Sequence, residues 1–103
     1  MASPLHTGGS TAGVSVTNAS TVLLAANTTR TRRFVSIANR KLNTLGLYVN
    51  FSDTVPTILL YDYYVAPGQS ISDNRQQPYQ GIVRGILDGA GPETVNVNDG
   101  TGA

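Results

Sequence analysis

Residues that could carry acid–base or nucleophilic chemistry are few and scattered along this chain of 103 residues. The only histidine is His6, near the N-terminus, and the chain has no cysteine. Nucleophilic catalysis needs a base beside a serine, threonine or cysteine, and a metal centre needs clustered histidine, cysteine or carboxylate ligands. The sequence shows neither pattern, and it has no Gly-x-Ser-x-Gly turn or lysine-containing phosphate loop. We therefore expect a protein that is not an enzyme, with no metal and no cofactor.

All six acidic residues lie in the second half of the chain, and they are spread out. They are Asp53, Asp62, Asp73, Asp88, Glu93 and Asp99. Two loops could bring Asp53 and Asp62 together as the carboxylate pair of a glycosidase. A domain this small rarely forms the deep cleft such a site needs, so we expect solvated loop acids instead.

The basic residues, in contrast, are concentrated, with five of the seven inside a twelve-residue window. They are Arg30, Arg32, Arg33, Arg40 and Lys41. The window could contact an acidic protein surface, form a solvated edge that prevents sheet-to-sheet aggregation, or bind nucleic acid through its phosphates. The net charge of only +1 argues against nucleic acid. The chain through Ser52 carries +5 and the rest +2 − 6 = −4, so a bipolar molecule could be steered towards a partner.

One aromatic cluster occurs, formed by Tyr61, Tyr63 and Tyr64 around Asp62. Three interpretations are open: core packing, an interface patch, since tyrosine is enriched at the centres of contacts, and sugar stacking. Tyr63 and Tyr64 are adjacent, so in a strand they must point to opposite faces. At least one of them should therefore lie outside the core or in a contact.

Composition and length place the chain among single-domain proteins with a thin core. Only 13 % of its residues are charged, which is common in β proteins with long turns and in subunits covered by neighbours. The first residues lack the basic start and apolar run of a signal peptide, and no apolar run is long enough for a membrane helix. The absence of cysteine suits folding in a reducing cytoplasm.

Short stretches of alternating apolar and polar residues predict about eight strands and no helix. The clearest alternation runs from Leu45 to Phe51, and with the run from Arg33 to Asn39 it predicts a central hairpin with the charged Arg40–Lys41 pair in its turn. The predicted strands cover 13–18, 21–25, 33–39, 45–51, 58–65, 70–72, 81–87 and 94–98. Asp62 interrupts the fifth strand, which predicts a bulge or two short strands there.

This pattern predicts an all-β fold, a small antiparallel β-sandwich with a jelly-roll-like arrangement. The sandwich is expected over 13–99, with a flexible tail at 100–103. Residues 1–12, which include Leu5 and His6, predict a flexible N-terminal arm. That arm could remain disordered or become ordered on a neighbouring subunit.

Three segments have an order and spacing that resemble small bacteriophage virion proteins. Ala26–Asn39 places an arginine before an apolar strand that ends in Ile-x-Asn, Leu47–Phe51 supplies a Tyr-Val-x-Phe strand, and Ala66–Ser70 supplies a Pro-Gly turn. The resemblance extends over about residues 21–87. It implies above all a head decoration, or cement, protein, and the proteins that it resembles include tail- and fibre-associated ones.

The resemblance implies a structural protein at the capsid surface of the virion, assembled in the host cytoplasm. It implies a homotrimer that binds and stabilises the shell of major capsid protein, with no membrane and no nucleic acid as partner. The five clustered basic residues would face acidic capsid surface, the three tyrosines would join protomers, and the arm would clasp a neighbour. The alternative is a tail- or head-fibre-associated adhesion module that binds host surface glycans.

Overall fold

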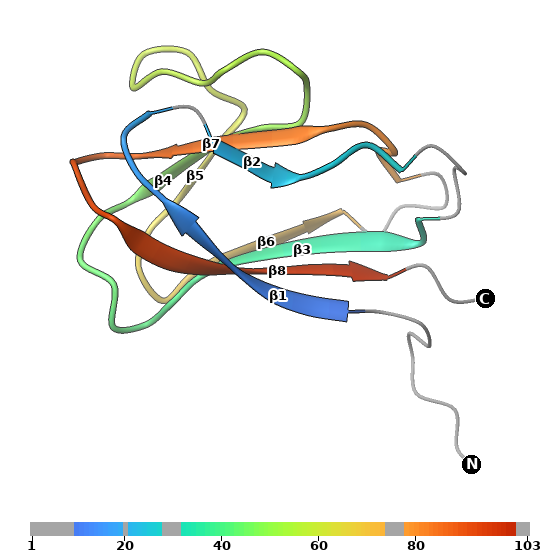
Figure 1. Cartoon of the computed structure of the whole chain (residues 1–103), viewed down its shortest axis with the longest axis horizontal. Helices are drawn as coiled ribbons and strands as arrows, with labels where there is room; N and C mark the ends of the chain where they lie inside the picture. Colours follow the sequence, from blue (N-terminus) through green and yellow to red (C-terminus); the bar gives the residue numbers. More distant parts are fainter. Residues whose placement is uncertain (1–9, 20, 28–31, 74–77, 101–103) are drawn as a thin grey trace.

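The computed structural model describes residues 10–19, 21–27, 32–73 and 78–100. These residues form eight strands in two antiparallel four-stranded sheets that pack face to face (Figure 1). The predicted all-β sandwich is therefore confirmed. The described ranges contain no helix at all, and so none long and apolar enough to cross a membrane.

Strand pairing is nested, because the first strand pairs with the last, the second with the seventh, the third with the sixth and the fourth with the fifth. The first sheet has the order β1 (Ser10–Val16), β8 (Glu93–Gly100), β3 (Phe34–Asn39) and β6 (Ser70–Asp73). The second sheet has the order β2 (Thr21–Leu24), β7 (Val83–Leu87), β4 (Leu47–Asn50) and β5 (Tyr63–Val65). The strands β5 and β6 are therefore neighbours in sequence but edge strands of different sheets.

The predicted central hairpin is wrong. β3 pairs with β6 and β8, whereas β4 pairs with β5 and β7, so the 40–46 connection crosses from one sheet to the other. Val35 and Ile37 of β3 and Leu47 and Val49 of β4 are all fully buried. The two apolar faces thus meet across the core, and alternation alone cannot distinguish that arrangement from pairing side by side.

The core between the sheets is a thin layer of branched aliphatic side chains, as the alternation in the sequence predicts. β3 alternates between half-buried and buried along its whole length, which is the burial expected of a strand with one solvent-facing side. The core residues are Val16, Leu23, Val35, Ile37, Leu47, Val49, Val65, Val83, Leu87, Val95 and Val97. Each of the eight strands contributes at most two of them, so no single strand builds the core.

The predicted strand over 58–65 is only partly present. β5 comprises Tyr63–Val65, while residues 58–60 form a bend. The ends of the sandwich also differ from the predicted boundaries, since β1 begins at Ser10 and β8 continues to Gly100. Pairing of Ser10 with Asp99 and of Phe34 with Gly100 accounts for both extensions. Leu5 and His6 of the predicted arm lie outside the described residues.

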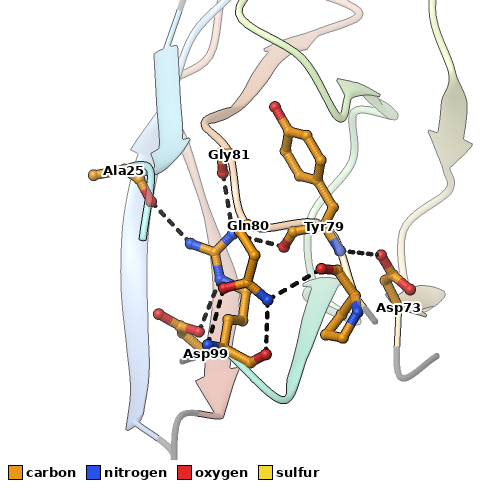
Figure 2. Close-up of polar contacts among 8 residues, drawn as sticks. Ala25, Asp73, Tyr79, Gln80, Gly81 and Asp99 are labelled. Atoms are coloured by element: carbon orange, nitrogen blue, oxygen red, sulfur yellow. Dashed lines mark hydrogen bonds and ion pairs between the residues drawn. The ribbon is translucent and has the colours of Figure 1, made fainter. Parts of the chain in front are cut away.

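The side chain of Arg32, two residues before the start of β3, is completely buried and joins the two sheets. Its Nε donates to Asp99 Oδ1 at 3.1 Å, and its Nη1 donates to the carbonyl oxygens of Tyr79 and Gly81, each at 3.0 Å. Its Nη2 donates to the Ala25 carbonyl oxygen at 2.9 Å. Figure 2 shows these acceptors converging from different parts of the chain on one guanidinium group.

The backbone of Arg32 is fixed as well, because Gln80 binds both of its polar groups. The Arg32 amide donates to Gln80 Oε1 at 3.0 Å, and Gln80 Nε2 donates to the Arg32 carbonyl oxygen at 2.8 Å. A buried guanidinium is tolerated only when its donors are satisfied and its charge is paired. The network therefore holds the segment before β7 against the start of β3.

Asn39 ties the sheets together at the opposite end of β3. Its buried Nδ2 donates to the carbonyl oxygens of Leu45 and Val65, each at 2.9 Å, and its Oδ1 accepts from Asn43 Nδ2 at 2.8 Å. Both acceptor carbonyls belong to the β4–β5 side of the sandwich. β3 is thus connected to the second sheet at each end by a buried polar side chain.

Replacing Arg32 with methionine should lower the free energy of unfolding by about 3 kcal/mol, because Asp99 and three carbonyl groups lose a charged donor. Arg32→Lys should recover only part of this loss, since an ammonium group cannot reproduce the planar set of donors. The neighbouring, exposed Arg33 provides the control, and Arg33→Met should change stability by less than about 0.5 kcal/mol. Urea denaturation followed by tyrosine fluorescence measures all three values. Similar small losses for Arg32→Met and Arg33→Met would contradict this account of the network.

Candidate protein-interaction surface

The 51–62 segment between β4 and β5 projects from the outer side of the second sheet, away from the first sheet (Figure 1). Its base is fixed by hydrogen bonds to two polar side chains. Asn50 Nδ2 donates to the Thr54 carbonyl oxygen at 3.1 Å, and Asn50 Oδ1 accepts from the Asp62 amide at 2.8 Å. Asp62 Oδ2 in turn accepts from the Phe51 amide at 2.9 Å. These hydrogen bonds therefore fix the two ends of the loop next to each other.

The tip of this loop is shaped by Thr57. Its Oγ1 accepts from the amides of Leu59 and Leu60, at 3.2 and 2.9 Å, and its amide donates to the Leu60 carbonyl oxygen at 2.8 Å. Such hydroxyl-to-backbone bonds stabilise tight turns. The turn leaves the side chains of Ile58, Leu59 and Leu60 57 %, 85 % and 75 % exposed. Hydrogen bonds thus hold three large aliphatic residues in water.

A cluster of three tyrosine rings continues this apolar surface onto the sheet. The Tyr48 ring lies 4.8 Å from the Tyr61 ring and 5.1 Å from the Tyr64 ring, measured between centroids. Tyr61 and Tyr64 remain more than 40 % exposed. Burial, with smaller contributions from Asp88 and the two other phenols, raises the pKa of Tyr48, so its hydroxyl stays protonated at neutral pH.

We define the contact surface as the exposed loop residues Val55, Ile58, Leu59 and Leu60 together with the tyrosine cluster Tyr48, Tyr61 and Tyr64. Monomeric soluble proteins rarely leave a large contiguous apolar area in water, and such areas commonly mark interaction sites. The outer face of the first sheet differs, because most of its outward positions are polar, with Phe34 and Ala38 as exceptions. The polar positions include Ser15, Ser36, Ser70, Ser72, Thr94 and Asn96. The sandwich therefore has one mostly polar outer face and one more apolar outer face.

The five basic residues predicted to contact a partner do not form one patch. Arg30 lies outside the described residues, and Arg32 is buried, so the prediction that Arg32 faces a partner is wrong. Arg33 precedes β3 whereas Arg40 and Lys41 follow it. The six residues of β3 separate them by roughly 20 Å at the rise of an extended strand.

The charges of the two halves of the chain are also mixed by the fold. Arg32 of the first half pairs with Asp99 of the second, and Glu93 of the second half accepts from the backbone of the turn that follows Arg40 and Lys41. β8, which carries two of the acids, lies directly beside β3. The fold thus places acids of the second half among bases of the first, and the strongly bipolar distribution that the sequence allows does not arise there.

The basic turn after β3 is held in place by Glu93. The Glu93 carboxylate accepts from the amides of Thr44 and Leu45 and from the Thr44 hydroxyl, at 2.9 to 3.2 Å. These hydrogen bonds hold the pKa of Glu93 below its usual value, and the one from the Thr44 amide has the largest effect. The exposed tip of this turn consists of Arg40, Lys41 and Leu42, and the Leu42 side chain is 92 % exposed. Arg40 Nε also donates to Asn96 Oδ1 at 2.9 Å.

The acids considered for a glycosidase pair have structural partners in this fold. Asp53 is bound by Arg84, and Asp62 is bound by the Phe51 amide. Within the described ranges, no group of three or more histidine, cysteine or acidic side chains is close enough to hold a metal ion.

Sequence reasoning found two of the three residues of the tyrosine cluster but missed the most exposed part of the contact surface. Tyr61 and Tyr64 were predicted as contacts, as was Tyr63, which lies on the other face and contacts the Phe51 ring with centroids 5.5 Å apart. The apolar character of Ile58, Leu59 and Leu60 instead predicts a strand. The sequence feature that indicates a loop here is the pair of polar residues on either side of the apolar run, Thr57 and Asp62. Both residue types stabilise turns.

Comparison of the chain with protein-family models, with curated proteins and with solved structures found no match in any of the three. The functional argument therefore rests on the fold and on the contact surface.

Leu59 and Leu60 supply a direct test of the contact surface, because they are exposed in the single chain. If the contact surface joins copies of the chain, the double variant Leu59→Ser/Leu60→Ser should weaken self-association, measured by sedimentation velocity, at least about fivefold. The same variant should change the free energy of unfolding by less than about 0.5 kcal/mol. Leu42→Ser, at an exposed leucine outside the contact surface, should leave association unchanged. Equal association of the double variant and the unmodified chain would remove the loop from the contact.

Proposed function

We propose that this protein is a virion structural protein, a capsid decoration protein that stabilises the phage shell by binding its outer surface, and that it is not an enzyme. The observation that supports this most strongly is the loop that holds Ile58, Leu59 and Leu60 in water next to three tyrosine rings. A small domain gains stability by burying such residues. Their exposure in a hydrogen-bonded turn therefore favours burial against another protein.

The strand arrangement supports the same proposal by analogy of fold. We infer that the nested pairing of the eight strands is a jelly-roll arrangement, and jelly rolls recur in viral capsid domains and in lectins. A fold alone does not determine a function, so this analogy adds to the contact surface and does not replace it.

The distribution of surface types suits a protein that is attached to a larger particle. The polar outer face of the first sheet remains in water, and the apolar outer side of the second sheet meets other subunits. We propose that the tyrosine cluster and the loop join copies of the chain, with a homotrimer as the expected assembly. A symmetric oligomer that touches several shell subunits multiplies modest contacts through effective concentration.

The basic residues that remain exposed would guide this assembly onto the shell. Arg40 and Lys41 occupy one exposed tip, and Arg33 is exposed at the other end of β3. Charges at the rim of a contact mainly speed association and set specificity, and they are screened by salt. We therefore propose that the shell surface facing this tip, which belongs to the major capsid protein, is acidic.

Co-sedimentation with shells assembled from the major capsid protein of the same phage tests the proposal. The protein should bind expanded empty shells and not immature ones, and the variant Arg40→Glu/Lys41→Glu should lower occupancy roughly fivefold at low salt. The difference should disappear near about 0.5 M salt, where charges are screened.

Two results would contradict the proposal in different ways. Absence of the unmodified chain from the shell pellet would remove the decoration function. Normal, salt-independent occupancy of the charge-reversed variant would remove only the electrostatic part.

A further inference from the structure

A cleft opens between the free edges of the two sheets, where β5 and β6 are the outermost strands. Its volume is about 600 Å³, and it is lined by Phe51, Asp62, Tyr63, Ile71, Ser72, Asp73 and Tyr79. Clefts of this size commonly accommodate small organic ligands. It lies apart from the contact surface, since Tyr63 lines it while the adjacent Tyr64 belongs to the tyrosine cluster.

One wall of the cleft is a row of aromatic rings. The Phe51 ring lies 5.5 Å from the Tyr63 ring and 5.8 Å from the Tyr79 ring, measured between centroids. Tyr63 is 50 % exposed, so its ring offers free apolar area to a molecule in the cleft. The opposite wall comes from β6, whose Ile71 is half-buried.

Two carboxylates also face the cleft, one from each sheet's side. Asp62 Oδ2 accepts from the Phe51 amide, and Asp73 Oδ2 accepts from the Tyr79 amide, each at 2.9 Å. A carboxylate has about four acceptor positions, so Asp62 can accept from a ligand beyond its bond to the Phe51 amide. Asp62 is exposed, whereas Asp73 is only 8 % exposed.

The aromatic wall is positioned by the network around Arg32. The Tyr79 carbonyl oxygen accepts from Arg32, its amide donates to Asp73, and its hydroxyl donates to the Ile82 carbonyl oxygen at 2.8 Å. Figure 2 shows the link from Asp73 to Tyr79. Burial raises the pKa of Tyr79, which keeps the phenol protonated as a donor. The ring is therefore held in place before any ligand binds.

We propose that this cleft binds a neutral sugar unit of a glycan. The apolar C–H face of a pyranose would pack on the Tyr63 ring, and its hydroxyl groups would donate to Asp62, while Asp73 adds a second negative charge to the lining of the cleft. The same two carboxylates would repel uronic and sialic acids, which restricts the ligand to uncharged sugars. This inference does not rest on the proposed decoration function. The cleft is lined by Tyr63, whereas the contact surface contains Tyr64, which lies on the opposite face of β5.

The arrangement of the rings favours a sugar over a quaternary ammonium group. Cation-binding cages surround their ligand with aromatic faces, whereas these rings contact one another along one wall. A cavity of about 600 Å³ also exceeds what a single methylated ammonium group fills.

Titration of the full ¹⁵N-labelled chain by NMR tests the inference, with the methyl β-glycosides of glucose, galactose and N-acetylglucosamine as probes. Choline and glucuronate serve as cationic and anionic comparison probes. At least one neutral glycoside should shift the amides of Phe51, Tyr63 and Ser72 with a millimolar Kd. The inference is overturned if no neutral glycoside shifts these amides at tens of millimolar, or if choline or glucuronate binds there more tightly.

Adjacent tyrosines supply matched variants. Tyr63→Ala should weaken sugar binding about tenfold and Asp62→Asn about fivefold, while Tyr63→Phe should retain the affinity. Tyr64→Ala should leave sugar binding unchanged and weaken self-association instead, so failure of one proposal is distinguishable from failure of the other. An unchanged Kd in both Tyr63→Ala and Asp62→Asn would exclude the cleft as the site. Peak dispersion in each spectrum reports whether the variant is folded.

Discussion

The buried guanidinium of Arg32 is the interaction on which the rest of this structure depends. The guanidinium group connects two segments of the second sheet's side, one after β2 and one before β7, to β8 of the first sheet. The backbone amide of Arg32 donates to the side chain of Gln80. A charge without partners at this depth would cost several kcal/mol. The sandwich must therefore bring all its acceptors together at once, which fixes how the two sheets meet at this end. Asn39 performs the equivalent role at the other end of β3.

Between these two polar anchors the core is narrow and consists mostly of valine. A chain of this length buries only a modest fraction of its surface on folding, so every aliphatic residue left outside the core reduces its stability. The loop nevertheless keeps Ile58, Leu59 and Leu60 outside, by means of hydrogen bonds from Thr57 and at its base from Asn50. These residues are a candidate interaction surface because hydrogen bonds hold them in an exposed position, and not because they are exposed alone.

Local pattern was sufficient to predict the strands and their inward faces. Val35 and Ile37, and likewise Leu47 and Val49, alternate with polar neighbours, and all four are buried. The separation of Tyr63 from Tyr64 followed from the same period of two, and their ring contacts confirm it. In these cases the information lies within a few residues of the position concerned.

Properties that depend on distant residues could not be predicted in this way. Nothing near Arg32 distinguishes it from Arg33, because its partners lie 7 to 67 residues away. The pairing of β3 with β8, not β4, depends on the whole topology. The strand propensity of Ile58–Leu60 was overridden by hydrogen bonds from Asn50 and Thr57, whose effect appears only once the loop has closed. The cleft combines side chains from both sheet edges and so has no local signature.

Hydrogen–deuterium exchange of the protein, compared between dilute samples and samples concentrated enough to self-associate, tests the central claim most directly. If the apolar side of the second sheet joins copies of the chain, self-association should slow exchange in 48–49 and 58–64 and leave strand β8 of the first sheet unchanged. Protection confined to β1 and β8, or an exchange pattern identical in the two states, would contradict it.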